Sequence, residues 1–157
     1  MVDISPTLQR LEKAEAEYKQ AKKEHAAKLA ELHILKFAEL FEPYPQLESF
    51  GFEVYSEYND EGGYYWAISA SVQPSDELGS YEEEYTTIDR VSGENVTRSY
   101  TVYVAEQLEE RLSDDIEPET VVALCNRING TNYNDPGEVG EVDISMDDFR
   151  RVLAEIS

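Results

Sequence analysis

The sequence has few of the residues that enzymes use for catalysis. It contains one cysteine, Cys125, and two histidines, His25 and His33. A single cysteine excludes an internal disulfide framework, and we expect it to be a small core residue. The histidines lie in one predicted helix, where a spacing of eight residues places them roughly 80° apart around the axis. Nucleophilic and acid–base catalysis need a group beside a base, so we predict no catalytic residue, no cofactor and no enzymatic activity.

Long apolar runs are also absent. No run approaches the 18 or more apolar residues of a membrane span, and no basic segment followed by an apolar one resembles a signal peptide. Leu, Ile, Val and Phe nevertheless make up 37 of the 157 residues, which is above the level of about 20% below which a highly charged chain is expected to be disordered. We expect a folded, cytoplasmic protein that does not bind membranes.

Lysine is missing from most of the chain. The first 41 residues hold seven basic and seven acidic side chains, whereas residues 42–157 hold 27 acidic side chains, six arginines and no lysine. The whole formal charge of −21 therefore belongs to the part that follows residue 41. Such a surface repels nucleic acid and anionic membranes and attracts basic proteins. Adaptation to high salt is an alternative reason for the excess of acid.

The longest predicted element is a helix from Pro6 to Glu42, with Ser5 as its N-cap and no Gly or Pro in its interior. Residues 1–28 carry only a narrow apolar stripe on a charged rod, which we expect to project or to form a homodimer, parallel or antiparallel. From Leu29 to Phe41 the helix is apolar nearly all round, as in a buried helix. Replacement of Leu35 by Asp is therefore expected to unfold the domain at 29–157.

The remaining residues predict an α+β fold, with the long helix packed on a four-stranded antiparallel meander followed by about three shorter helices. The predicted strands are residues 49–58, 64–72, 81–91 and 96–102, and the predicted helices are residues 104–112, 118–128 and one that begins after Ser145. Residues 131–140 read as a loop. Phe52, Val54, Trp66 and Ile68 are expected to face the long helix.

A cation site is a weaker possibility near the C-terminus. Residues 142–149 resemble the exit half of an EF-hand loop, but counting back puts Gly137 and Val139 at ligand positions and Val142 where the turn glycine belongs. The sequence therefore predicts no resident metal. The weak candidates for a divalent cation are four carboxylates of an irregular loop: Asp135, Glu138, Glu141 and Asp143.

The most distinctive local feature is the segment Tyr81-Glu82-Glu83-Glu84-Tyr85. On a strand, Glu82 and Glu84 share one side and lie about 6.7 Å apart, while Glu83 and the tyrosines share the other. This spacing is about twice the rise of 3.4 Å per phosphate along one DNA strand. The predicted partner-binding set joins this segment to a second strand, as follows: Glu53, Tyr55, Glu57, Tyr58, Tyr81, Glu82, Glu83, Glu84 and Tyr85. The alternative is a solvated sheet face.

In size, acidity and tyrosine content, and in the absence of a catalytic signature, the part from Glu42 onward resembles the small phage and mobile-element inhibitors that mimic nucleic acid, among them anti-restriction and anti-CRISPR proteins. The resemblance is compositional and involves no shared motif. It implies an inhibitor that acts in a host cell's cytoplasm on a basic, nucleic-acid-binding protein and does not itself contact nucleic acid. The alternatives are a structural, assembly or adaptor protein that works through its long helix, and a protein that binds divalent cations weakly.

Overall fold

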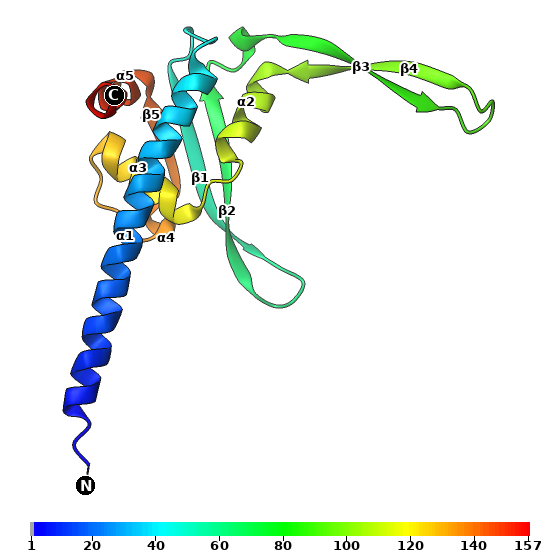
Figure 1. The fold of residues 1–157 in the computed structure, drawn as a ribbon. Coiled ribbons are helices and arrows are strands. Elements are labelled where there is room, and N and C mark those ends of the chain that lie inside the picture. The colour runs from blue at the N-terminus through cyan, green and yellow to red at the C-terminus, as the bar shows by residue number, and fades with distance from the viewer. Residues whose placement is uncertain (1) are drawn as a thin grey trace.

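Helix α1 spans Ser5–Phe41 in the computed structural model, which describes residues 2–157 (Figure 1). Its N-cap is Ile4 rather than the expected Ser5. The reason is local, because the Asp3 carboxylate accepts a hydrogen bond of 3.0 Å from the backbone N–H of Ser5. That bond lowers the pKa of Asp3 below its ordinary value. An acidic group at this end also interacts favourably with the helix dipole.

Only one face of the second half of α1 is buried. The first buried residue is Ala26, and every residue from 5 to 25 is exposed. Ile34 is fully buried, whereas Leu32 and Leu35 are 45% and 43% exposed. The expectation of a helix buried all round is therefore wrong, because a sheet and helices cover one side of α1 and solvent covers the other. The buried positions are Ala26, Ala30, His33, Ile34, Phe37 and Phe41.

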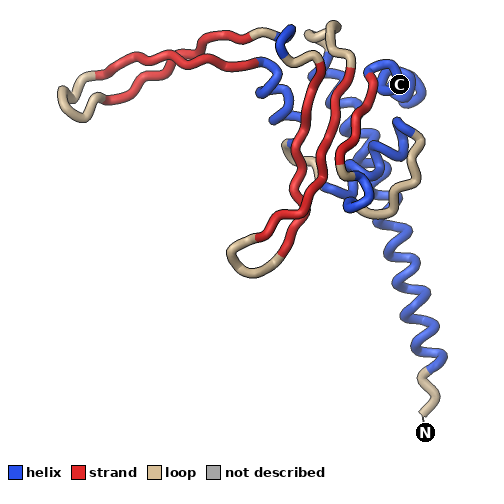
Figure 2. Tube along the Cα trace, turned by 180° about the vertical axis from the view of Figure 1, so that it is seen from behind, coloured by secondary structure: helices blue, strands red, loops and turns tan. Residues whose placement is uncertain are grey.

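The central sheet has three strands in the order β2-β1-β5, all antiparallel. Strands β1 (Ser49–Tyr58) and β2 (Tyr64–Gln73) form the predicted hairpin. The third strand is β5 (Glu141–Ser145), in a stretch where no strand was predicted. Helices cover one face of this sheet, and Figure 2 shows the other face from its open side. An antiparallel sheet tolerates one solvated face, since its outward residues can be polar.

The predicted four-stranded meander is wrong. After the 3-10 turn η1 (Asp76–Leu78), strands β3 (Ser80–Ile88) and β4 (Asn95–Tyr103) pair only with each other. They form a long hairpin that extends away from the rest of the molecule (Figures 1 and 2). Glutamates and threonines alternate with the tyrosines of β3, so this strand offers no continuous apolar face to a core, and the hairpin does not pair with the central sheet.

The core is built on phenylalanine rings from α1, the central sheet and the last helix. Phe50 of β1 contacts Phe37 at 5.9 Å and Phe41 at 5.0 Å between ring centroids, and it meets Phe149 edge-on at 5.5 Å. Phe52 and Val54 are buried in this core, and the Phe52 ring lies 6.3 Å from that of Phe37 in α1, as predicted for Phe52. Trp66 does not join this core: it is 44% exposed, and its ring lies over Gly137.

Four helices follow the hairpin arm: α2 (Val104–Ser113), α3 (Pro118–Asn129), the short α4 (Pro136–Val139) and α5 (Met146–Ile156). Sequence analysis had predicted α2, α3 and α5 but not α4. The stretch that was expected to be a loop, residues 131–140, thus holds a helical turn, and β5 begins directly after it. Helix α2 protects the free edge of β2, since the Glu109 carboxylate accepts a hydrogen bond of 3.0 Å from the backbone N–H of Val72.

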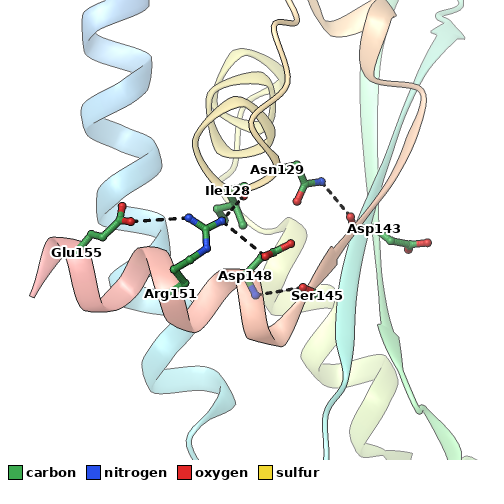
Figure 3. A network of polar contacts seen from close by, with 7 residues as sticks. All are labelled: Ile128, Asn129, Asp143, Ser145, Asp148, Arg151 and Glu155. Carbon is green, nitrogen blue, oxygen red and sulfur yellow. Dashed lines mark hydrogen bonds and ion pairs between the residues drawn. The ribbon is translucent and has the colours of Figure 1, made fainter.

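Polar contacts fix α5 and β5 against α3 (Figure 3). Ser145 is the N-cap of α5, as predicted, and its Oγ accepts a hydrogen bond of 3.1 Å from the backbone N–H of Asp148. The guanidinium of Arg151 donates to the carbonyl of Ile128 at 3.3 Å. The side-chain amide of Asn129 donates to the carbonyl of Asp143 at 3.0 Å, on the edge of β5 that faces away from β1.

Among residues 2–157, no helix combines the length and the apolar character that crossing a membrane requires.

Candidate functional site

The hairpin arm, residues 80–103, carries the acidic and aromatic segment that the sequence analysis singled out. Every residue of β3 is exposed. Its register with β4 pairs Glu82 with Thr101 and Glu84 with Ser99, so these four residues share one side, called here the acidic side of the arm. Glu83 pairs with Tyr100 on the opposite side. The alternation predicted for Glu82 and Glu84 against Glu83 is therefore confirmed.

Two of the three glutamates are held by hydroxyl groups of the neighbouring strand. Thr101 Oγ1 donates to Glu82 Oε1 at 2.6 Å, and the Tyr100 hydroxyl donates to Glu83 Oε2 at 2.6 Å. The bond to Glu83 raises the pKa of Tyr100 above its ordinary value, because the carboxylate accepts the phenolic proton and repels a phenolate. Each carboxylate keeps its other oxygen for a partner.

The side of the arm that faces away from Glu82 and Glu84 is aromatic, and is called here the tyrosine side. Tyr81, Tyr85 and Tyr100 lie on it, each between 42% and 46% exposed. The rings of Tyr85 and Tyr100 are 5.8 Å apart. Arg98 lies opposite Tyr85 in the register. Tyr81 also anchors the base of the arm, since its hydroxyl donates to Gln107 Oε1 of α2 at 3.3 Å.

The structure places the remaining predicted residues in a different sheet. Glu53, Tyr55 and Glu57 alternate along β1 on the open face of the central sheet. Tyr58 belongs to the same strand, and its ring lies 5.3 Å from that of Tyr64. Because β1 and β3 do not pair, the nine predicted residues are divided between two sheets, and those on β3 are divided again between the two sides of the arm. Alternation within a strand can be inferred from sequence, but membership in a sheet depends on distant pairing.

The open face of the central sheet is a second acidic surface. Glu53 is paired in register with Glu141 of β5, and the hydroxyl of Tyr65 donates to Glu57 at 2.6 Å. That bond raises the pKa of Tyr65. Asp143 lies close to Gly51, where an added Cβ would be 2.8 Å from its carboxylate oxygen. Glu141 and Asp143 were missed as sheet residues, although the alternation of Val142 and Ile144 with acids is the signal of a strand.

Within residues 2–157, no group of three or more His, Cys, Asp or Glu side chains is arranged to hold a metal ion. The four candidate carboxylates are not gathered: Asp135 precedes α4, Glu138 lies in α4, and Glu141 and Asp143 lie in β5. Glu138 is engaged locally, since its Oε1 accepts a hydrogen bond of 3.2 Å from the backbone N–H of Asn134.

Of the few potentially catalytic side chains, Cys125 and His33 are buried and His25 is exposed. Cys125 is fully buried in α3, and burial raises the pKa of its thiol to about 11. His33 is buried against Phe37, with 5.6 Å between ring centroids, and burial lowers its pKa. His25 is exposed on α1. A thiol with so high a pKa is a poor nucleophile at neutral pH, because the thiolate is the reactive form.

Comparison with protein-family models, curated proteins and solved structures finds no match for this chain.

Proposed function

We propose that this protein is a non-enzymatic inhibitor that binds a basic, nucleic-acid-handling protein through its hairpin arm, with Glu82 and Glu84 on the acidic side and Glu83 on the tyrosine side. The observation that carries the proposal is the arm itself, two paired strands whose glutamates point to solvent from an otherwise unsupported hairpin. A two-stranded hairpin is at best marginally stable in water. A partner that packs against the arm supplies the contacts that the rest of the chain does not.

The acidic side presents charge at a spacing that a nucleic-acid site can accept. Glu82 and Glu84 lie on one side of β3 with about 6.7 Å between alternate residues, close to two phosphate steps of about 3.4 Å along a single strand. The arm carries few charges, since residues 80–103 hold five acidic and two basic side chains. The proposed surface therefore resembles a short segment of nucleic acid that fits a basic groove, rather than a long stretch of duplex.

The carboxylates are also held in place before a partner arrives. The hydrogen bonds from Thr101 to Glu82 and from Tyr100 to Glu83 restrict both side chains. Binding then costs less side-chain entropy, which otherwise amounts to about 0.5–1.5 kcal/mol for each immobilised side chain. The surrounding acidic surface speeds the encounter, and the tyrosines supply contact area and hydrogen bonds.

Affinity capture with matched variants tests this proposal. The protein, immobilised, is exposed to lysate of its source cell and washed at low and at high salt. We expect a basic protein to be retained at low salt and released at high salt, because the screening length falls from about 10 Å at 0.1 M to about 3 Å at 1 M. Replacement of Glu82, Glu83 and Glu84 by Lys should abolish this retention.

The control makes the same change of charge away from the arm. Asp60 and Glu61 lie in the β1–β2 turn and Glu110 lies on α2, and all three are exposed. Their joint replacement by Lys should leave retention nearly unchanged if the arm is the binding surface. Equal loss in both triple variants would show that only the net charge matters, and unchanged retention in the arm variant would show that the arm is a solvated surface.

A second candidate function, assembly through the long helix, is favoured by the exposure of α1. Residues 5–25 are all exposed, and the N-terminal end of α1 extends beyond the other elements (Figure 1). Leu8, Leu11 and Tyr18 are 50%, 62% and 67% exposed on it. Most of the stability of a helix in a protein comes from the packing of an apolar face, and residues 5–25 bury no side chain. A partner that covers these side chains would stabilise it.

A further inference from the structure

A groove of about 790 Å³ runs along α1 where this helix begins to contact the domain. One wall is α1, and the other is formed by α3 and residues 132–136. Small apolar side chains lie at its base, among them Ala26 and Ala27 of α1 and Val122 and Ala123 of α3. Small residues allow close approach of another helix, since the separation of two packed helix axes, about 8–10 Å, depends on the side chains between them.

The α1 wall of the groove is basic in a protein of net charge −21, whereas the opposite wall carries Arg127 together with the acidic Glu119 and Asp135. Lys19, Lys22 and Lys23 lie along the α1 wall. Their contacts within the chain are weak: Lys19 pairs with Glu15 at 3.1 Å on the exposed surface, and Lys22 lies 3.8 Å from Glu119. Exposed pairs of this kind contribute little to stability. The lysines of the α1 wall are therefore available to an acidic partner.

The exposed stripe of α1 and the groove lie on the same side of the helix. At about 100° per residue, Leu8 and Ala26 are five full turns apart and lie on one line. Leu11 and Lys22 lie within about 60° of that line on one side, and Lys19 lies about 20° from it on the other. One partner helix can thus cover the stripe and fill the groove in a continuous contact.

Charge along α1 distinguishes two orientations of such a partner. Residues 12–17 contain Glu12, Lys13, Glu15 and Glu17, with a net charge of −2. Residues 19–28 contain four lysines and one glutamate, with a net charge of +3. A parallel second copy would place like charges together, whereas an antiparallel copy places the acidic stretch of each helix against the basic stretch of the other. Charges that flank a helix pair determine orientation in this way.

We infer that the protein forms an antiparallel homodimer in which the first half of each α1 lies in the groove between α1 and α3 of the other copy. The two-fold axis passes near residues 18 and 19, which brings Glu15 of one copy to Lys22 of the other and Leu11 to Ala26. This inference concerns a different surface from the hairpin arm and does not depend on the proposed function. Both arms of the dimer remain free to bind.

A charge swap tests the pairing of Glu15 with Lys22, and the mass in solution is read by light scattering over a range of concentrations. The parent should have twice the chain mass of 17.9 kDa at tens of micromolar. Glu15→Lys and Lys22→Glu should each raise the dimer dissociation constant about tenfold, because the pair occurs twice and each change creates like-charge contacts. The double variant should restore dimerisation to near the parent level.

Two substitutions that add the same charge at different faces of α1 test which face the partner copy covers. Leu11→Glu puts a carboxylate into the proposed contact and should give a monomer. Gln20→Glu changes the charge by the same amount about 120° away from the line through Leu8 and Ala26, and should leave the dimer intact. Both positions are exposed in the single chain, so neither change should unfold it. A monomeric parent, or equal effects of these two changes, would overturn the inference.

Disulfide formation tests the orientation. Under mild oxidation with oxidised glutathione, Tyr18→Cys should link two chains, because residue 18 lies near the two-fold axis. Leu8→Cys should not, because its two copies are separated by about 30 Å of helix and a disulfide requires Cβ atoms about 3.5–4.5 Å apart. Cys125 is buried and should not react. Linkage at both positions would indicate a parallel dimer, and failure at position 18 would exclude the proposed axis.

Discussion

The two neighbouring residues Ile34 and Leu35 provide a sensitive test of how α1 sits on the domain. Ile34 is fully buried, while Leu35 is 43% exposed on the same helix turn. Truncation of a buried isoleucine to alanine costs about 2–5 kcal/mol, because it removes apolar contacts and leaves a cavity. We expect Ile34→Ala to cost about 3 kcal/mol and Leu35→Ala about 1 kcal/mol or less.

Urea denaturation measures this difference. With a slope of about 2 kcal/mol per molar urea, Ile34→Ala should lower the unfolding midpoint by about 1.5 M and Leu35→Ala by about 0.5 M or less. The slopes of the two variants should match that of the parent, so that the midpoints report stability alone. The two substitutions leave alanine in one helix, which makes their propensity terms similar. Equal midpoints, or a larger loss at Leu35, would refute the placement of α1.

Three further predictions concern the core, the sheet and a helix cap. Burial lowers the pKa of His33 in the folded chain, so as pH falls through about 6.5 the unfolded chain binds more protons than the folded chain. The parent should therefore lose stability below that pH relative to His33→Gln. Urea midpoints measured across pH 5 to 8 test this. Gly51→Ala would place a Cβ 2.5 Å from the carbonyl oxygen of Val142, so it should disrupt the β1–β5 pairing and cost about 1–3 kcal/mol, whereas Ser71→Ala in the next strand should cost less. Ser145→Ala removes the cap of α5 and should cost about 1 kcal/mol, which corresponds to about 2–4 °C in the thermal midpoint, while a threonine at that position should retain most of the stability.

Local signals were sufficient for much of the fold. The proline-started α1 and α3, the β1–β2 hairpin and the Ser145 cap are each determined within a few residues, and all were predicted. The run from Leu29 to Phe41 was misleading, because an apolar run shows that some face is buried without showing how many neighbours surround it. Leu32 and Leu35 are half-exposed since no element covers that side of α1.

The errors concern pairing between distant segments. Strand β5 has five residues and pairs with β1 across about ninety residues of sequence. The alternation of Val142 and Ile144 with acids was a local signal of this strand, but its pairing with β1 could not be inferred from local periodicity. Strands β3 and β4 were predicted as strands but were wrongly placed in the central sheet, although their composition argues against a position in the core. On β3 the segment from Tyr81 to Ile88 offers no continuous apolar face, and a strand in a packed sheet needs one.

In the candidate site too, local alternation was predicted correctly and pairing between distant segments was not. Alternation along β3 correctly separated Glu82 and Glu84 from Glu83, because successive side chains of a strand point to opposite sides. Alternation could not show that β1 belongs to another sheet, and Glu53 and Glu57 therefore lie on a second acidic surface with Glu141. Alternation also could not predict the hydrogen bonds from the hydroxyls of Tyr100 and Thr101, since these depend on the register between β3 and β4.

Displacement of nucleic acid is the measurement that tests the central proposal most directly. The basic protein retained in the capture experiment is bound to a fluorescently labelled oligonucleotide, and its anisotropy is followed as this protein is added. The parent and the variant with Lys at positions 60, 61 and 110 should release the oligonucleotide, whereas the variant with Lys at positions 82, 83 and 84 should not. Undiminished anisotropy with the parent, or release by the arm variant at the same concentrations, would contradict the proposal that the hairpin arm occupies a nucleic-acid groove.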